Sequence, residues 1–262
     1  MAEAVEGRNW ARPVTQAAVA LSISAVAIAL IASLGSGQGA WHFSAAFTIL
    51  RYAFFAAIAG ALLALIGAFL ARRKHQPGLL WPNVVALVVA LGFIVYLGSQ
   101  IITARTVPAI HDVSTNLDDM PQFTKLTVRE DNLDKIPDMG RPELAEMDPE
   151  SRWKAIHREA YEDVKTIRLP ESPADVIRNA ERLARERGWE IAKVDTAAGI
   201  LEATATTTFF RFKDDVIVRA RLYPEVKGGS YVDMRSISRV GGSDVGVNAE
   251  RIRAFLTDLQ KA

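Results

Sequence analysis

The chain has 262 residues, of which 31 are basic and 30 acidic, and this balance provides no basic stripe of the kind that nucleic acids select. Cysteine is absent, which excludes disulfides, thiolate metal sites and thiol catalysis. The charges are unevenly distributed, because residues 1–105 hold only seven of the basic and two of the acidic residues. We therefore expect two parts, a membrane anchor of residues 1–105 and a polar domain of residues 106–262.

Three apolar stretches without charged residues lie in the first part, at about residues 14–34, 52–71 and 79–102. A bilayer core of roughly 30 Å needs about 20 such residues in a helix. Buried helices of soluble proteins carry a polar face, which these stretches lack. The pattern predicts three transmembrane helices, with the lipid bilayer as a partner. The alternative for the first stretch is a cleaved signal peptide, for which it is long.

Basic residues flank the spans at two places: Arg8 and Arg12 before the first span, and Arg72, Arg73 and Lys74 between the second and the third. Such residues mark the cytoplasmic side of a membrane. Three crossings then place the residues after Arg105 on the opposite side. We expect a multi-pass protein of the bacterial inner (plasma) membrane, with its N-terminus in the cytoplasm and its C-terminal domain in the periplasm.

The second span carries small residues along one face, namely Ala53, Ala57, Gly60, Ala61, Ala64 and Gly67. Small residues let helices approach closely in lipid. This face predicts helix packing, either within the chain or across a homo-oligomer. No ionisable residue lies in mid-membrane, so the spans read as an anchor and not as a transport path.

The second part begins with an irregular lead-in, rich in Pro, Asp and Asn, that extends to about residue 148. A helix is predicted at about residues 149–164. The next helix has Ser172 as its N-cap and Pro173 at its first position, and Gly188 ends it.

The apolar period then changes to two, which predicts strands at about residues 189–195, 199–207, 215–222 and 230–239. Turn signals join them, including Lys227–Gly229, and short links favour antiparallel neighbours. A last helix is predicted at about residues 248–260. We expect an α+β domain in which two or three helices pack on one face of an antiparallel four-stranded sheet. Phe209, Phe210 and Phe212 are expected to close the core near the second turn.

Alternation along the strands places polar residues on one side of the predicted sheet. If the register aligns them, the face carries Glu202, Thr204, Thr206, Arg219, Arg221, Asp233, Arg235 and Arg239. One interpretation is a solvated face with cross-strand ion pairs. Another is a recognition face for a phosphate or carboxylate, which arginine forks suit, and a third is a protein-binding face.

The stretch RVGGSDVGVN joins the last strand to the last helix. Gly241, Gly242, Ser243 and Asp244 predict a tight turn, and Asn248 is the expected N-cap, with Val247 and Ile252 as a hydrophobic staple. The alternative is an anion nest of exposed amides at the helix start, which the carboxylate of Asp244 would oppose. The flanking arginine strands are therefore the better candidate site.

Catalytic patterns are sparse, since the four histidines (His42, His75, His111 and His157) share no metal-ligand spacing. His111 and Asp112 stand next to each other in the lead-in, and they would suit a general-base pair only if their side chains shared the required geometry. No HExxH, GxSxG or Walker pattern occurs, and we expect no cofactor, no metal and no catalytic residue.

Four segments carry a family resemblance: TNLDDMPQF, GWEIAKVDTAAGILEATATT, FRFKDDVIVRARL and VDMRSISRVGGSDVGVNAERIRAFL. In this order they resemble the domain of unknown function numbered 1499, over about residues 106–260. The resemblance implies one domain after the spans, often preceded by a membrane segment in similar proteins. It implies no activity, ligand or catalytic residue.

These observations favour a protein without catalytic activity whose outer domain binds an envelope component or a partner protein. One alternative is an envelope enzyme for a phosphorylated or anionic substrate, with arginines as charge clamps. A second is a membrane scaffold or assembly factor that acts through the small-residue face.

Overall fold

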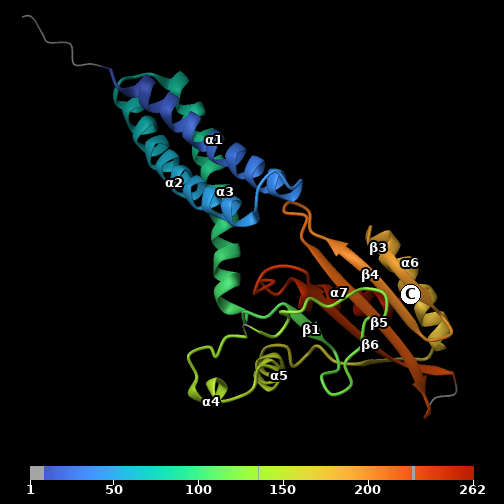
Figure 1. Cartoon of the computed structure of the whole chain (residues 1–262). Coiled ribbons are helices and arrows are strands. Elements are labelled where there is room, and N and C mark those ends of the chain that lie inside the picture. The colour runs from blue at the N-terminus through green and yellow to red at the C-terminus, as the bar shows by residue number, and fades with distance from the viewer. Residues whose placement is uncertain (1–8, 135, 226–227) are drawn as a thin grey trace, which may run out of the picture. The chain divides into compact units, whose positions relative to one another are not determined.

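The computed structural model describes residues 9–134, 136–225 and 228–262, so Arg8 and Lys227 lie outside the described residues. The chain divides into two compact units, which are shown in Figure 1. One unit comprises Met1–Ile102 with Thr208–Arg211, and the other comprises Thr103–Thr207 with Phe212–Ala262.

The first unit contains the long helices α1 (Ala11–Gly37) and α2 (Phe43–Arg73), the short η1 (Pro77–Leu79) and most of the long helix α3 (Leu80–Thr106), whose residues from Thr103 onward belong to the second unit. An 18-residue window in each helix has a mean hydropathy of 2.4, 2.5 and, with η1 included, 2.3, which makes each helix apolar enough to cross a membrane. At 1.5 Å per residue, each helix is also long enough to span roughly 30 Å of hydrocarbon. The three predicted spans lie within these helices, as a multi-pass membrane protein requires.

Small residues let α1 and α2 pack closely, and α3 contacts these helices through its buried residues Asn83, Ala86 and Ala90. The buried residues of α2 are all alanine or glycine. A side chain at Gly60 would collide with Ser22 of α1, and one at Gly67 would collide with Asn83 of α3. The Asn83 amide also donates a 2.8 Å hydrogen bond to the Thr15 hydroxyl of α1. The small-residue face of the second span is therefore buried against helices of the same chain.

The second unit is an α+β domain with six strands. The strands are β1 (Asp112–Ser114), β2 (Ile167–Leu169), β3 (Glu190–Asp195), β4 (Ile200–Thr206), β5 (Lys213–Tyr223) and β6 (Gly229–Ser238). Their order is β1-β6-β5-β4-β3, β2 also pairs with β6, and every pairing is antiparallel. The helices are α4 (Pro142–Ala145), α5 (Pro149–Ala160), α6 (Pro173–Glu186) and α7 (Val247–Leu259).

The predicted class and the antiparallel meander of β3 to β6 are confirmed, but the predicted number of four strands is wrong. The additional strands β1 and β2 each have three residues, too few for a period of two to show in the sequence. Both pair with β6, β1 toward its C-terminal end and β2 toward its N-terminal end. The lead-in is consequently part of the sheet and not only a connection to it.

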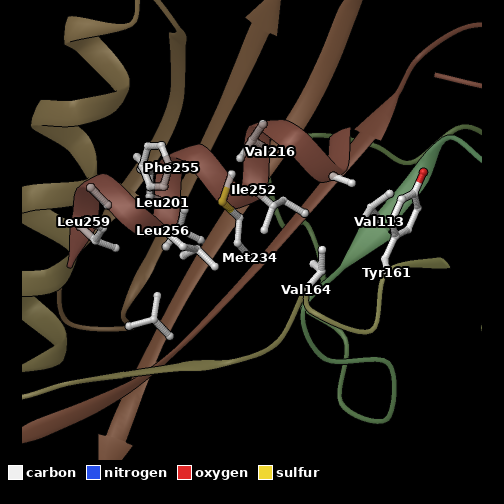
Figure 2. Close-up of a cluster of buried hydrophobic side chains, with 14 of the residues drawn as sticks. Val113, Tyr161, Val164, Leu201, Val216, Met234, Ile252, Phe255, Leu256 and Leu259 are labelled. Carbon is white, nitrogen blue, oxygen red and sulfur yellow. The ribbon is translucent and has the colours of Figure 1, made fainter. Parts of the chain in front are cut away.

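The hydrophobic core lies between the apolar side of β4 to β6 and the helices. Figure 2 shows Phe255 and Leu256 of α7 beside Leu201 and Met234 of the strands. The predicted cap of α6 is present, because the Ser172 hydroxyl accepts a 3.2 Å hydrogen bond from the Asp175 amide. Burying a Leu or Phe side chain, as at Leu201, Phe255 and Leu256, contributes roughly 1.5–3 kcal/mol to the stability of the domain.

The phenylalanines expected in the core lie elsewhere. Phe209 is 42% exposed, and neither Phe210 nor Phe212 is fully buried. The last pair of the β4–β5 ladder is Thr206 with Lys213, so Phe209 and Phe210 stand in the hairpin loop beyond the sheet. Residues beyond the ladder do not reach the helices that cover the apolar side.

Candidate functional site

The register brings the predicted polar residues onto one side of the sheet, which we call the polar face. Arg219 of β5 lies opposite Asp233 of β6, and Ile217 lies opposite Arg235. Glu202 of β4 pairs with the same Ile217. Because alternate residues share a side, this face carries Glu202, Thr204, Thr206, Asp215, Arg219, Arg221, Asp233, Arg235 and Arg239.

The lead-in crosses the polar face and buries its centre. Glu202 has no exposed surface, and its carboxylate accepts hydrogen bonds from the backbone amides of Thr124, Lys125 and Leu126 at 2.7–3.1 Å. The Thr124 hydroxyl donates a further bond at 2.6 Å. Burial alone would raise the pKa of Glu202, but these donors outweigh it and hold the pKa below its ordinary value. The carboxylate therefore fastens the lead-in to the sheet.

Arg235 is used by the same segment. Its guanidinium donates to both carboxylate oxygens of Asp112, at 2.9 and 2.7 Å, and only 3% of the residue is exposed. Asn132 donates a 2.7 Å bond to the same carboxylate. A buried ion pair of this geometry positions β1 against β6 and leaves Arg235 no access to a ligand from solution.

Arg239 directly follows β6 and is exposed. Its guanidinium donates to both carboxylate oxygens of Asp215, at 2.9 and 2.8 Å, and one nitrogen also bonds the Thr204 hydroxyl at 3.1 Å. The hydrogen bonds with Asp215 raise the pKa of Arg239. Thr206 is exposed at the end of β4 and has no place in this pairing. This corner is a local ion pair, with its charge compensated.

Arg219 and Arg221 differ from Arg235 and Arg239, because these two arginines share two carboxylates, one buried and one exposed. Fully buried Asp233 accepts a 2.8 Å hydrogen bond from each guanidinium. On the outer side Asp119, from a loop of the lead-in, bonds Arg219 at 3.1 Å and Arg221 at 2.8 Å. The side chain of Asp119 is 57% exposed and that of Arg221 is 43% exposed. An exposed carboxylate thus occupies the outer position of an arginine pair.

Aromatic side chains extend the polar face next to this pair. The rings of Tyr223 and Tyr231 lie 4.6 Å apart, and the guanidinium of exposed Arg168 lies over both, at 5.2 and 5.6 Å. Arg168 pairs with Tyr231 in the β2–β6 register and so shares its side. We call Arg168, Arg221, Tyr223 and Tyr231 the tyrosine–arginine patch.

Sequence reasoning missed most of this patch. The tyrosines continue the alternation that identified the arginines, at 219, 221 and 223 and at 231, 233 and 235, so the signal was present. Arg168 and Asp119 gave no signal. The first stands on an unpredicted three-residue strand, and the second lies in a loop without periodicity.

In the turn before α7, backbone amides donate hydrogen bonds to the carboxylate of Asp244, a residue of the same turn. α7 begins at Val247, and Asp244 accepts hydrogen bonds from the amides of Gly246, at 2.9 Å, and Asn248, at 2.8 Å. Burial raises the pKa of Asp244 even though these two donors oppose the change. The exposed amides that an anion nest requires are therefore already used.

The expected N-cap, Asn248, is the second residue of α7 and does not cap the helix. Its buried amide instead donates to the carbonyl of His111 at 2.9 Å and to the Ser238 hydroxyl at 3.0 Å. Gly246 takes the cap position with φ of 80°, a conformation that asparagine adopts less readily than glycine. Gly241 has φ of 89°, a left-handed conformation that favours glycine, and Gly242 and Ser243 complete the turn. The hydrogen bonds of Asp244 and Asn248 described above give this turn a structural role.

The histidines of the domain are buried structural groups. His157 accepts a 3.1 Å hydrogen bond from the Ser114 amide, and burial lowers the pKa of His157 to about 4. His111 lies 3.1 Å from the Asn132 oxygen. The ring of Tyr161 lies 5.5 Å from that of His157, and burial raises the pKa of this tyrosine to about 12. Within the described part of the chain no group of three or more His, Asp or Glu residues could hold a metal ion.

Comparison with known proteins identifies one family. Residues 112–259 match the family described as protein of unknown function DUF1499, and the matched range runs from the start of β1 to the last residue of α7. Neither the curated proteins nor the solved structures contain a match to this chain.

Proposed function

The chain belongs to the DUF1499 family, and we propose that it is a membrane-anchored binding protein that recognises an anionic group of an envelope component without catalysis. The proposed binding site is the arginine pair of Arg219 and Arg221 with the adjoining tyrosine–arginine patch. In this proposal the protein resides in the bacterial inner membrane and its C-terminal domain faces the periplasm. Support for that orientation comes from the basic residues that precede α1 and α3.

One observation carries the proposal: exposed Asp119 occupies the outer side of the arginine pair. Arginine forks bind carboxylates and phosphates alike. An incoming anion can take the place of Asp119 while buried Asp233 keeps both guanidiniums in position. Displacing an exposed ion pair costs about 1 kcal/mol or less, so the competition is weak.

The patch beside the pair supports a recognition role for a second reason. Tyrosine and arginine, together with tryptophan, are enriched among the residues that dominate the binding energy of protein interfaces. Arg168 stands over both tyrosine rings, and the rings offer apolar area next to the charge. This composition suits a ligand with an anionic group and an adjoining apolar or sugar-like body.

Removing the competing carboxylate tests the proposal. We expect Asp119→Asn to strengthen binding of inorganic phosphate to the full chain about fivefold, the equivalent of roughly 1 kcal/mol. Binding is measured as thermal stabilisation in phosphate against chloride at constant ionic strength. Asp118→Asn is the matched control, because Asp118 is also exposed but pairs with Arg158. Identical phosphate responses of the wild type, Asp119→Asn and Arg221→Gln would refute the site.

A further inference from the structure

A groove lies on the unit of apolar helices, between the first turns of α1 and the start of α3. Its volume is about 330 Å³, at the lower end of the range for small-molecule sites. The residues that line it include Arg12, Gln16, Val19 and Ala20 of α1, Leu79 of η1 and Pro82 of α3. Those of α1 recur at intervals of three and four positions, so they lie on one face of that helix.

Hydrogen bonds between the helices hold the walls of the groove in place. Thr15, which also lines the groove, donates a 2.8 Å bond to the carbonyl of Ala11 and accepts a 2.8 Å bond from the Asn83 amide. The same amide nitrogen donates to the carbonyl of Leu79 at 2.7 Å, and both Thr15 and Asn83 are buried. Lipid offers these polar groups no partner, so α1 and α3 keep their spacing here. The groove is consequently formed before a ligand enters it.

The polarity of the groove changes along α1. Arg12 and Gln16 lie near the start of the helix, and Val19 and Ala20 lie one to two turns further along it. Arg12 and Ala20 are eight positions apart, which corresponds to about 12 Å of helix. A phospholipid has the same order of chemistry, from a charged phosphate through a polar glycerol backbone to an acyl chain. The groove therefore suits a lipid whose phosphate lies at Arg12.

Aromatic side chains indicate that the polar end of the groove lies at the level of the lipid head groups. Trp10 directly precedes α1, Trp81 is next to Pro82 in α3, and these tryptophans are 51% and 72% exposed. Tryptophan is enriched where a bilayer meets water. The apolar lengths of α1 and α3 then carry the rest of the groove toward the hydrocarbon.

The charge at this end of the helices favours an anion. Residues 9–102 and 208–211, which are the described part of this unit, contain no Asp or Glu. The exposed side chain of Arg12 thus has no carboxylate to pair with in that part of the unit. Arg72 and Arg73 end α2 at the same end of the bundle, since η1 contacts both α1 and α2. Basic pockets between transmembrane helices bind acidic lipid head groups.

We propose that the groove binds one anionic phospholipid, with its phosphate on the guanidinium of Arg12 and an acyl chain along the apolar part of the groove. The bound lipid adds contacts to α3, whose buried residues are Asn83, Ala86 and Ala90. This site belongs to the unit of apolar helices and is separate from the arginine pair of the sheet. Neither site depends on the other.

Native mass spectrometry of the full chain in detergent tests the proposal, because it counts bound lipids. The chain is mixed with equal amounts of phosphatidylglycerol and phosphatidylethanolamine that carry the same acyl chains. We expect the complex with one phosphatidylglycerol to exceed the complex with one phosphatidylethanolamine at least about fivefold. Arg12→Gln should remove this preference.

Arg73→Gln is the matched control, because it removes the same charge at the same end of the helices from a residue outside the groove. At a salt concentration that screens distant charges, it should change the preference by less than about twofold. Equal amounts of the two lipids on the wild type would overturn the proposal. An Arg12→Gln chain with the wild-type preference would overturn it as well.

Further arms separate a lipid from other occupants of the groove. Ala20→Phe should fill the apolar part and weaken phosphatidylglycerol binding as strongly as Arg12→Gln does. Ile23→Phe, at an exposed position of α1 outside the groove, should leave binding unchanged, and equal effects of the two variants would contradict the placement of the acyl chain. Soluble glycerol phosphate in large excess should not displace the lipid, and displacement would show a site for free phosphate. A dimer without bound lipid would assign the groove to a second copy of the chain and overturn the proposal.

Discussion

Replacing Glu202 by glutamine tests whether the lead-in is held by one buried carboxylate. Glutamine keeps the shape of the side chain but supplies one acceptor oxygen, and its NH₂ group faces an amide that also donates. The carboxylate accepts from three backbone amides and one hydroxyl. A hydrogen bond to a charged group contributes about 1.5–3 kcal/mol, and a buried amide left without an acceptor costs about 1–3 kcal/mol.

Glutamine can keep the hydrogen bonds that one carboxylate oxygen accepts. It loses those of the other oxygen, chiefly the bond from the Leu126 amide. Relief from burying a charge offsets part of this loss. We therefore expect Glu202→Gln to destabilise the domain by about 3 kcal/mol, which lowers Tm by roughly 6–12 °C for a domain of this size. Because the pKa of Glu202 is lowered by folding, the ionised carboxylate stabilises the domain above the ordinary pKa of glutamate. This stabilisation is lost as the pH falls through the lower pKa of the folded state.

Two measurements check this expectation on the full chain. Circular dichroism melting gives Tm, and hydrogen exchange reports the amides of residues 124–126, which should exchange faster in the variant. Glu190→Gln is the control, because the Glu190 side chain is 74% exposed and its removal should be neutral. A Glu202→Gln chain that melts within about 2 °C of wild type, with unchanged exchange at residues 124–126, would show that the Glu202 carboxylate does not hold the lead-in.

Three further predictions concern the domain. His157 has a folded pKa depressed to about 4 from 6.5, so up to about 3 kcal/mol of stability should be lost as pH falls from 6.5 toward 4, and urea titrations at stepped pH should show it. Arg235→Lys keeps the charge but loses the two-pronged bond to Asp112, which should cost about 2–3 kcal/mol in the same titration. Gly199→Ala should cost about 2 kcal/mol or more, because φ is 69° and the new methyl group collides with the carbonyl of Ala220.

Each of these has an internal comparison. His157→Gln should remove the acid-induced loss between pH 6.5 and 4, and an unchanged pH profile would contradict the assignment to His157. Arg235→Lys as stable as wild type would show that the charge alone suffices. Gly188→Ala has a similar φ of 70° but open space around it, so it should cost only about 1 kcal/mol, and equal losses would discount the collision.

The long strands and their polar face could be predicted because alternation over seven or more residues is an unambiguous signal. Arg219, Arg221, Asp233 and Arg235 followed directly from it. The burial of that face could not be predicted. The segment that covers it has no periodicity, and it binds Glu202 through backbone amides, which every sequence carries.

The start of α7 shows a second limit of local reasoning. Asp244 and Asn248 are both residue types that cap helices, and their spacing does not distinguish them. The left-handed conformation of Gly246 decides the matter, because it directs the amides of residues 246 and 248 toward Asp244. Asn248 is then available to bond the carbonyl of His111, a contact across 137 positions that no local pattern encodes.

The pairing of the first strand with the last constrains when the domain can form. Asp112 and Arg235 are 123 positions apart, and at roughly 5–20 residues per second a ribosome needs about 6–25 s to synthesise the intervening chain. During that interval β1 has no partner strand. Pairings of such large separation also form slowly once both segments exist. Newly made chains should therefore pass through a period in which residues 112–126 are open to proteases, and that period should end only after β6 has emerged.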